Sequence, residues 1–100
     1  MTLEFTDAAV SDLRSIRDDT LEKWGQRQEQ IYLEAMWKRF EEIVSDPGRW
    51  RFRDDLFPGC QLAAQGRHVV LFRVRRKNLQ IVRILHGSMD YPRHIPPELE

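Results

Sequence analysis

The chain has 100 residues, 41% of them hydrophobic, and a formal net charge of zero. This length predicts one domain with a radius of gyration of roughly 13 Å, large enough for a single core but not for two, and the hydrophobic fraction argues against wholesale disorder. The single cysteine, Cys60, excludes an intramolecular disulfide, and no apolar run approaches the roughly 20 residues that span a bilayer.

The cysteine content and the first residues predict a cytoplasmic protein. One cysteine fits a reducing compartment. Residues 1–10 lack the charged start and the long apolar core of a secretory signal peptide. We therefore expect no membrane partner.

The charges are unevenly distributed along the chain. Residues 1–50 hold eleven acids and seven bases, whereas residues 51–100 hold five acids and nine bases. No acid lies between Leu56 and Met89, a stretch whose bases are Arg67, Arg73, Arg75, Arg76, Lys77 and Arg83. A basic surface of this kind suits nucleic acid or an acidic partner. The alternative is that the cations at 75–77 only protect a hairpin end from edge pairing.

The first half of the chain predicts a strand and a helix. Residues 3–6 alternate apolar and polar, as in a short half-buried strand, and Thr6 or Asp7 can cap the helix that follows. The apolar face of that helix consists of Val10, Leu13, Ile16, Thr20 and Leu21. Its charged residues fall elsewhere and should be exposed: Asp12, Arg14, Asp18 and Asp19.

A second helix follows directly after Gly25, a glycine that favours a left-handed helix stop. Its apolar stripe consists of Tyr32, Ala35, Met36, Phe40, Ile43 and Val44. Proline at position 47 ends this helix, because proline lacks the amide hydrogen and disfavours helix in the residue before it. The short turn predicts an antiparallel helical hairpin.

Beyond Pro47 the pattern changes to strands, at Cys60–Ala64, Arg67–Arg75 and Leu79–His86. The connections are so short that neighbouring strands must be antiparallel. The order β-α-α-β-β-β predicts an α+β fold in which the helical hairpin packs on one face of a small antiparallel sheet. Residues 91–100 are expected to leave the fold as a mobile tail.

The residues that could carry chemistry are few. Three histidines at positions 68, 86 and 94 lack metal-ligand spacing, so we expect no metal site, and no glycine-rich motif indicates a nucleotide or other cofactor. His86 and Asp90 could form an acid–base pair across a turn. The alternative is that His86 bonds a backbone group at the strand end while Asp90 caps the next segment. Ser88 beside His86 does not make a triad.

Several short motifs occur in an order that resembles the ParE branch of the ParE/RelE toxin superfamily. The first helix carries Ala9-x-x-Asp12-Leu13-x-x-Ile16 and ends in Trp24-Gly25. The remaining matching positions are Gln28, Tyr32, Phe40, Pro47, Gly48-Arg49, the strand Gly66–Arg73, Arg83–His86 and Met89-Asp90. Together they cover about residues 3–93, and they imply the same β-α-α-β-β-β fold.

This resemblance implies a non-enzymatic toxin of a type II toxin–antitoxin module. Its expected target is DNA gyrase, and its expected partner is a ParD-like antitoxin from an adjacent gene, through which the complex contacts operator DNA. One alternative is a RelE-like endoribonuclease that cuts mRNA on the ribosome, supported by Arg67, Arg73, Arg83 and Tyr91. Against it, residues 86–91 contain no arginine or lysine, and Asp90 would repel phosphate. A third reading is a non-toxic co-repressor that only binds the antitoxin.

Two surfaces follow from this reading. The second helix has more apolar residues than its sheet contact requires, so Ile31, Leu33 and Trp37 are predicted to bind the antitoxin. The loop after the last strand is predicted to bind the target, through His86, Met89, Asp90 and Arg93. The alternative for the loop is that Met89 and Asp90 only pin the tail to the fold.

Overall fold

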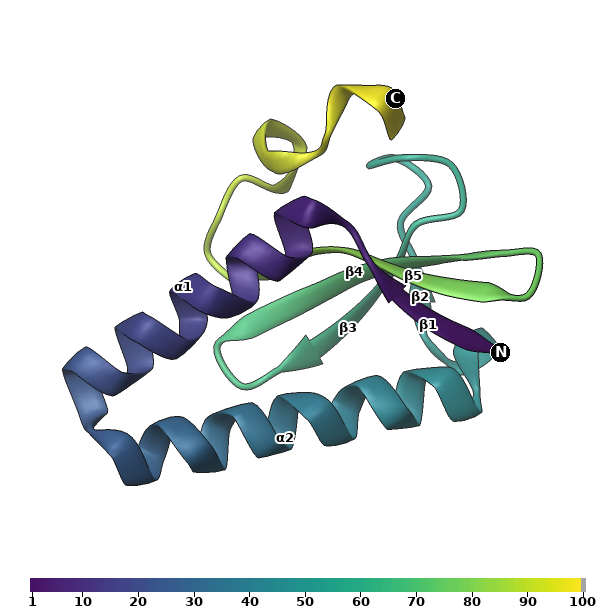
Figure 1. Ribbon diagram of the computed structural model, residues 1–100. Coiled ribbons are helices and arrows are strands. Elements are labelled where there is room, and N and C mark those ends of the chain that lie inside the picture. Colours follow the sequence, from purple (N-terminus) through teal and green to yellow (C-terminus); the bar gives the residue numbers. More distant parts are fainter. Residues whose placement is uncertain (100) are drawn as a thin grey trace.

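The computed structural model describes residues 1–99, which form a five-stranded sheet with two α-helices on one face (Figure 1). The elements are β1 (Thr2–Phe5), α1 (Asp7–Trp24), α2 (Gln26–Ser45), β2 (Arg51–Phe52), β3 (Gln61–Gln65), β4 (His68–Arg75) and β5 (Asn78–His86). Short 3-10 helices lie at η1 (Pro47–Arg49), η2 (Tyr91–His94) and η3 (Pro97–Leu99). The α+β class is confirmed, and the radius of gyration is 13.2 Å.

The sheet is mixed, with the strand order β1-β5-β4-β3-β2. Strands β3, β4 and β5 are antiparallel neighbours, as predicted. The expectation of a purely antiparallel sheet is wrong, because β1 pairs parallel with β5 in the register Leu3↔Leu79. The two helices and strands β2, β3 and β4 all lie between β1 and β5 in sequence, and a connection this long permits either direction. The two-residue strand β2, which pairs with β3, was not predicted.

The start and end of α1 follow the predicted capping. The hydroxyl of Thr6 accepts a hydrogen bond from Ala9 N at 3.0 Å and donates one to Val82 O at 2.7 Å, which ties the helix start to β5. Gly25, at φ +87°, ends α1 and precedes α2. The buried face of α1 is shifted from the prediction: it contains Ala9, Ile16 and Thr20, whereas Val10 and Leu21 are exposed.

The sheet is covered on both faces, so the buried side chains form two clusters instead of the single core expected. The first lies between the helices and the sheet and contains Ala9, Ile16, Met36, Phe40, Ile43, Ala63, Val70, Phe72, Leu79, Ile81 and Ile84. The second lies on the other face and contains Leu56, Phe57, Cys60, Val69, Leu71, Val82, Leu85, Ile95 and Leu99. A strand buried on both faces explains the continuous apolar run at residues 69–72.

A register shift in the β4–β5 ladder changes which β5 residues face the helices. Leu71 pairs with Arg83 and Phe72 pairs with Ile81, so Val82 is the extra residue on β5. The strict alternation predicted for this strand therefore breaks at Val82. As a result Ile84, and not Leu85, joins Ile81 in the cluster under the helices.

The C-terminal segment packs on the fold, contrary to the predicted departure of residues 91–100. Ile95 and Leu99 are buried against the second cluster, and the segment crosses the sheet on the side away from α2 (Figure 1). Glu100, the last residue of that predicted tail, lies outside the described residues. Within residues 1–99, none of the helices is both long enough and apolar enough to cross a membrane.

Candidate functional site

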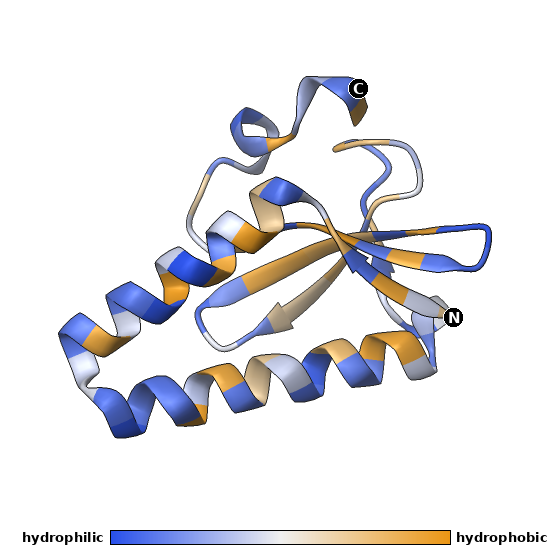
Figure 2. Ribbon diagram, viewed as in Figure 1, coloured by the Kyte–Doolittle hydropathy of each residue, from blue (hydrophilic) through white to orange (hydrophobic). Residues whose placement is uncertain are grey.

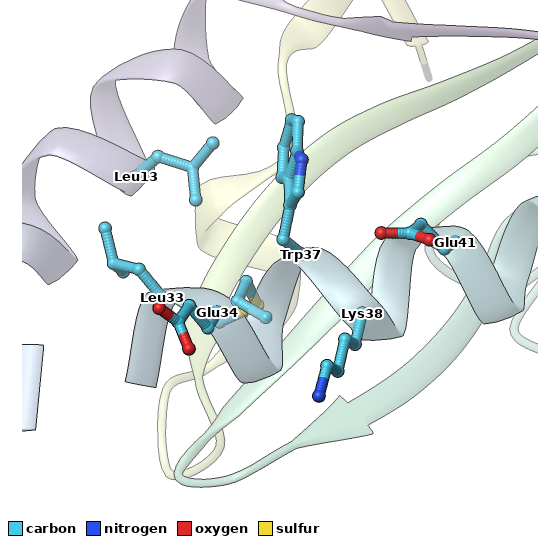
Figure 3. A pocket seen from close by; sticks show the side chains of 7 residues that line it. Leu13, Leu33, Glu34, Trp37, Lys38 and Glu41 are labelled. Atoms are coloured by element: carbon cyan, nitrogen blue, oxygen red, sulfur yellow. The ribbon is translucent and has the colours of Figure 1, made fainter. Parts of the chain in front are cut away.

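An apolar groove of about 520 Å³ lies along α2, open to solvent where α1 diverges from it (Figure 3). Its apolar lining consists of Leu13 of α1 with Leu33, Met36 and Trp37 of α2. Charged side chains of α2 at positions 34, 38 and 41 form its rim. An open apolar surface of this size on a small protein is typical of a site that binds another chain.

Two of the three predicted antitoxin-binding residues line this groove. Leu33 is partly buried, whereas Trp37 is 51% exposed while its indole stacks on Phe5 with the ring centroids 5.8 Å apart. The indole is therefore rigidly placed, with one side packed and the other open. Ile31 is 49% exposed but does not line the groove, because residues two apart on a helix point in nearly opposite directions.

The loop after β5 presents all four predicted target-binding residues to solvent. His86, Met89, Asp90 and Arg93 are each exposed. Met89 N donates to His86 O at 3.0 Å, which forms a tight turn. The loop is closed by Tyr91, whose hydroxyl donates to Gly87 O at 2.9 Å. The Tyr91 ring is partly buried against the second cluster, so Tyr91 joins the loop to the buried side chains on that face of the sheet.

His86 and Asp90 do not pair with each other. The Nδ1 atom of His86 accepts a hydrogen bond from Ser88 N at 3.2 Å and lies 2.7 Å from Ser88 Oγ. Asp90 forms an ion pair with Arg93 at 3.2 Å, and its side chain makes no capping hydrogen bond to η2. The acid–base pair is therefore wrong, whereas the backbone bond predicted for His86 is confirmed. Asp90 does stand at the N-cap position of η2, as predicted, and its backbone oxygen accepts from Arg93 N at 3.2 Å.

A partly buried ion pair anchors the loop at both ends. Arg83 donates to both carboxylate oxygens of Asp12 at 2.7 and 2.8 Å and to His94 O at 2.7 Å. Asp12 also accepts from Ile84 N at 2.9 Å. This arrangement joins α1, the end of β5 and the C-terminal segment. Asp12 was predicted to be exposed, but only 12% of its side chain is accessible, and helical periodicity could not reveal a partner 71 residues away.

A second support lies between the helices and the β3–β4 turn. The hydroxyl of Tyr32 accepts from Arg67 N at 3.0 Å, donates to Gln65 O at 3.2 Å and lies 2.6 Å from His68 Nδ1. The ring of His68 meets that of His86 with the centroids 5.7 Å apart. The turn also holds the loop, since Gly87 N donates to Arg67 O at 2.8 Å. The motifs at Tyr32, Gly66 and His86 thus meet in space.

The hydrogen bond to Asp12 raises the pKa of Arg83. Two further side chains, His68 and Cys60, have pKa values shifted by burial. Burial lowers the pKa of His68, and the neighbouring charges of His86 and Arg67 lower it further. Burial raises the pKa of the Cys60 thiol to about 12, so the reactive thiolate form is scarce at neutral pH. Within residues 1–99, no group of three histidine, cysteine or acidic side chains is placed to hold a metal ion.

The fold and the two surfaces define a small α+β domain with the features of a protein-binding module. The sequence profile of one family matches residues 3–91, and its description is "ParE toxin of type II toxin-antitoxin system, parDE". The chain belongs to this family of ParE toxins.

Individual relatives agree with this assignment. The chain is 32% identical to Toxin ParE1 of Caulobacter vibrioides over 87 residues, which cover 87% of this chain and 90% of the relative. It is 30% identical to Toxin ParE1 of Mycobacterium tuberculosis over 89 residues, covering 88% and 91%. A solved structure described as the chromosomal ParDE TA system from P. aeruginosa has the same fold, with a TM-score of 0.75 at 23% identity, covering 86% of this chain and 95% of that one.

Proposed function

We propose that this ParE toxin is a cytoplasmic, non-enzymatic inhibitor of DNA gyrase that a ParD-like antitoxin neutralises. The observation that supports a binding role for the loop after β5 is its construction. Four exposed side chains stand on a turn that Arg83 and Tyr91 hold from either side. Loops on a rigid scaffold commonly carry function, and Met89 with Arg93 offers an adaptable apolar contact beside a charge.

The ribonuclease alternative draws less support from the same residues. Arg83 is held by Asp12, Tyr91 donates to Gly87 O, and Arg73 Nε donates to Gln80 Oε1 at 2.9 Å. Of the residues invoked for that chemistry, Arg67 is left exposed, over the rings of Trp24 and Tyr32. The paired imidazoles of His68 and His86 are the feature that suits acid–base catalysis, so ribonuclease activity needs a direct test.

Assays with purified gyrase and with cells that express the chain separate the target classes. The gyrase proposal predicts that the chain blocks supercoiling of plasmid DNA and that induction without antitoxin triggers a DNA-damage response. The ribonuclease alternative predicts early translation arrest and mRNA cut in the ribosomal A site. Translation arrest with supercoiling intact would reverse the ranking. A chain that binds the antitoxin but inhibits neither process is the co-repressor.

A double variant tests the loop itself. Met89→Ala with Arg93→Ala should abolish gyrase inhibition and leave antitoxin binding intact, with a cost on the order of 2 kcal/mol of target binding for each truncated contact. Val10→Ala with Arg14→Ala is the control, because it removes an exposed apolar group and an exposed cation from α1. If the loop variant loses several degrees of melting temperature together with activity, the loop residues only pin the tail.

The groove along α2 is the proposed antitoxin site. Its volume of about 520 Å³ and its apolar lining suit the apolar face of an amphipathic helix, and the acids and the lysine that also line it can orient a charged partner. The ParDE description of the P. aeruginosa structure supports an antitoxin partner for this chain. In the proposed complex, operator DNA is contacted through the antitoxin.

Co-expression with the adjacent gene tests this site. Trp37→Ala should weaken co-purification, because it removes the large side chain at the groove. Trp24→Ala is the control and should leave co-purification unchanged, because it removes an equally large exposed indole that lies outside the groove. Ile31→Ala asks whether the partner extends beyond the groove around α2. Loss of binding by Trp24→Ala but not by Trp37→Ala would place the antitoxin elsewhere.

A further inference from the structure

The tip of the β4–β5 hairpin carries four cations in five residues. Residues 73–77 read Arg-Val-Arg-Arg-Lys, and Arg75 pairs with Asn78, so Arg76 and Lys77 make the turn. The hairpin projects from one end of the molecule (Figure 1) and is hydrophilic at its tip (Figure 2). None of the ion pairs among residues 1–99 involves these four cations.

The cations are concentrated and only weakly compensated. Arg73 and Arg75 are two residues apart on one strand, so they share a face about 7 Å apart. Glu4 is the acid whose charge acts on Arg73. The pKa of Arg73 is nonetheless lowered, by burial and then by Arg75. The tip therefore presents a local positive surface on a chain whose net charge is zero.

Protection against edge pairing explains only half of this cluster. β3 pairs with β4 no further than Phe72, so Arg73 and Arg75 do lie on a free strand edge where charge opposes aggregation. Arg76 and Lys77 lie in the turn, where no further strand can add, and Lys77 O already accepts from Thr2 N at 2.9 Å.

The backbone of Arg76 is a separate observation. Its φ is +58°, in the left-handed region where two-residue hairpin turns favour glycine or asparagine. Arginine at this position costs turn stability. Residues held in such conformations cluster at binding and catalytic sites, which makes position 76 a candidate binding position.

We propose that residues 73–77 bind the phosphate backbone of double-stranded DNA independently of base sequence. The charged side chains at the tip are all cations, and cations bind phosphate oxygens without reading the base sequence. A two-stranded ribbon fits the major groove of B-DNA, about 12 Å wide, whereas the major groove of duplex RNA is too narrow for it. The contact is made by the toxin itself and holds whether or not gyrase is the target.

Fluorescence anisotropy with the purified full chain and a labelled duplex of arbitrary sequence tests the proposal. Arg73 already donates to Gln80 Oε1, so the three exposed cations Arg75, Arg76 and Lys77 predict that log K falls with log salt concentration at a slope of about −2.7. Arg75→Gln with Arg76→Gln should reduce the slope to about −0.9 and weaken binding by at least about tenfold at low salt. Arg76→Lys keeps the charge and should keep the slope.

Two controls separate this site from general charge effects. Arg14→Gln with Arg27→Gln removes the same charge from exposed helical positions and should leave the slope unchanged. Arg76→Gly should weaken DNA binding while raising the melting temperature, because glycine relieves the backbone strain. Equal losses in both double variants would overturn the proposal, as would duplex RNA or poly-glutamate binding as tightly as DNA.

Discussion

The ion pair between Asp12 and Arg83 should be the most stability-sensitive polar contact in this fold. Asp12→Ala removes three hydrogen bonds. It also leaves the guanidinium of Arg83 without its carboxylate partner, although only 20% of the Arg83 side chain is accessible to solvent. Breaking a buried pair on one side costs roughly 3–5 kcal/mol. Because both side chains retain slight exposure, we expect about 3 kcal/mol, near the lower end of that range.

Urea unfolding and thermal melts measure this loss. For a domain of 100 residues it corresponds to a fall in melting temperature of roughly 12 °C or more. The matched control is Asp18→Ala on the same helix. It removes the 3.1 Å pair with Arg17, whose two side chains are 51% and 67% exposed, so it should cost less than about 1 kcal/mol.

A double-mutant cycle with Arg83→Met isolates the pair itself. The double variant Asp12→Ala with Arg83→Met has no unpaired buried charge, so it should be destabilised by less than the sum of the two single variants. The difference, which is the coupling energy, should be about 2 kcal/mol. If Asp12→Ala and Asp18→Ala destabilise the chain equally, Asp12 is screened by solvent like an ordinary surface acid, and its role in anchoring the loop is wrong.

Three further predictions concern the supports of the site. Gly66→Ala should lower the free energy of unfolding in urea by about 2–3 kcal/mol, because residue 66 has φ +58° and an added Cβ would lie 2.7 Å from the Tyr32 ring. Gly59→Ala is the control: its φ is also positive but no atom lies near the added Cβ, so it should lower that free energy by only about 1 kcal/mol. Similar losses for the two variants would show that crowding against Tyr32 does not matter. Because the pKa of His68 is lowered in the fold, the unfolded chain binds a proton at this residue more readily than the folded chain does. The contribution of neutral His68 to the free energy of unfolding is therefore fully present above the unfolded pKa of about 6.5 and is lost as the pH falls below it. His68→Gln should flatten that slope, and an unchanged slope would reject the assignment. The thiol of Cys60, with its pKa raised to about 12, should resist alkylation in the folded state at roughly pH 8, so rapid labelling there would show that the second cluster opens.

The sequence by itself determined the type and order of most elements. Period-2 alternation marked β4 and β5, and helical stripes marked α1 and α2. Gly25 and the proline at position 47 marked where the helices end. These signals are local, because each depends on residues a few positions apart. For the same reason the sequence also placed Ile31 and Trp37 on an exposed helical surface and the loop after β5 in solvent.

Only the tertiary structure decided which distant residues meet. The parallel pairing of β1 with β5, the burial of Ile95 and Leu99 and the capture of Asp12 by Arg83 all join segments far apart in the chain. Spacing within a helix or strand carries no information about such partners. From sequence alone, an aspartate on the polar side of α1 is expected to be exposed. In the fold, the end of β5 packs against Asp12, and the partly buried Arg83 stabilises its negative charge.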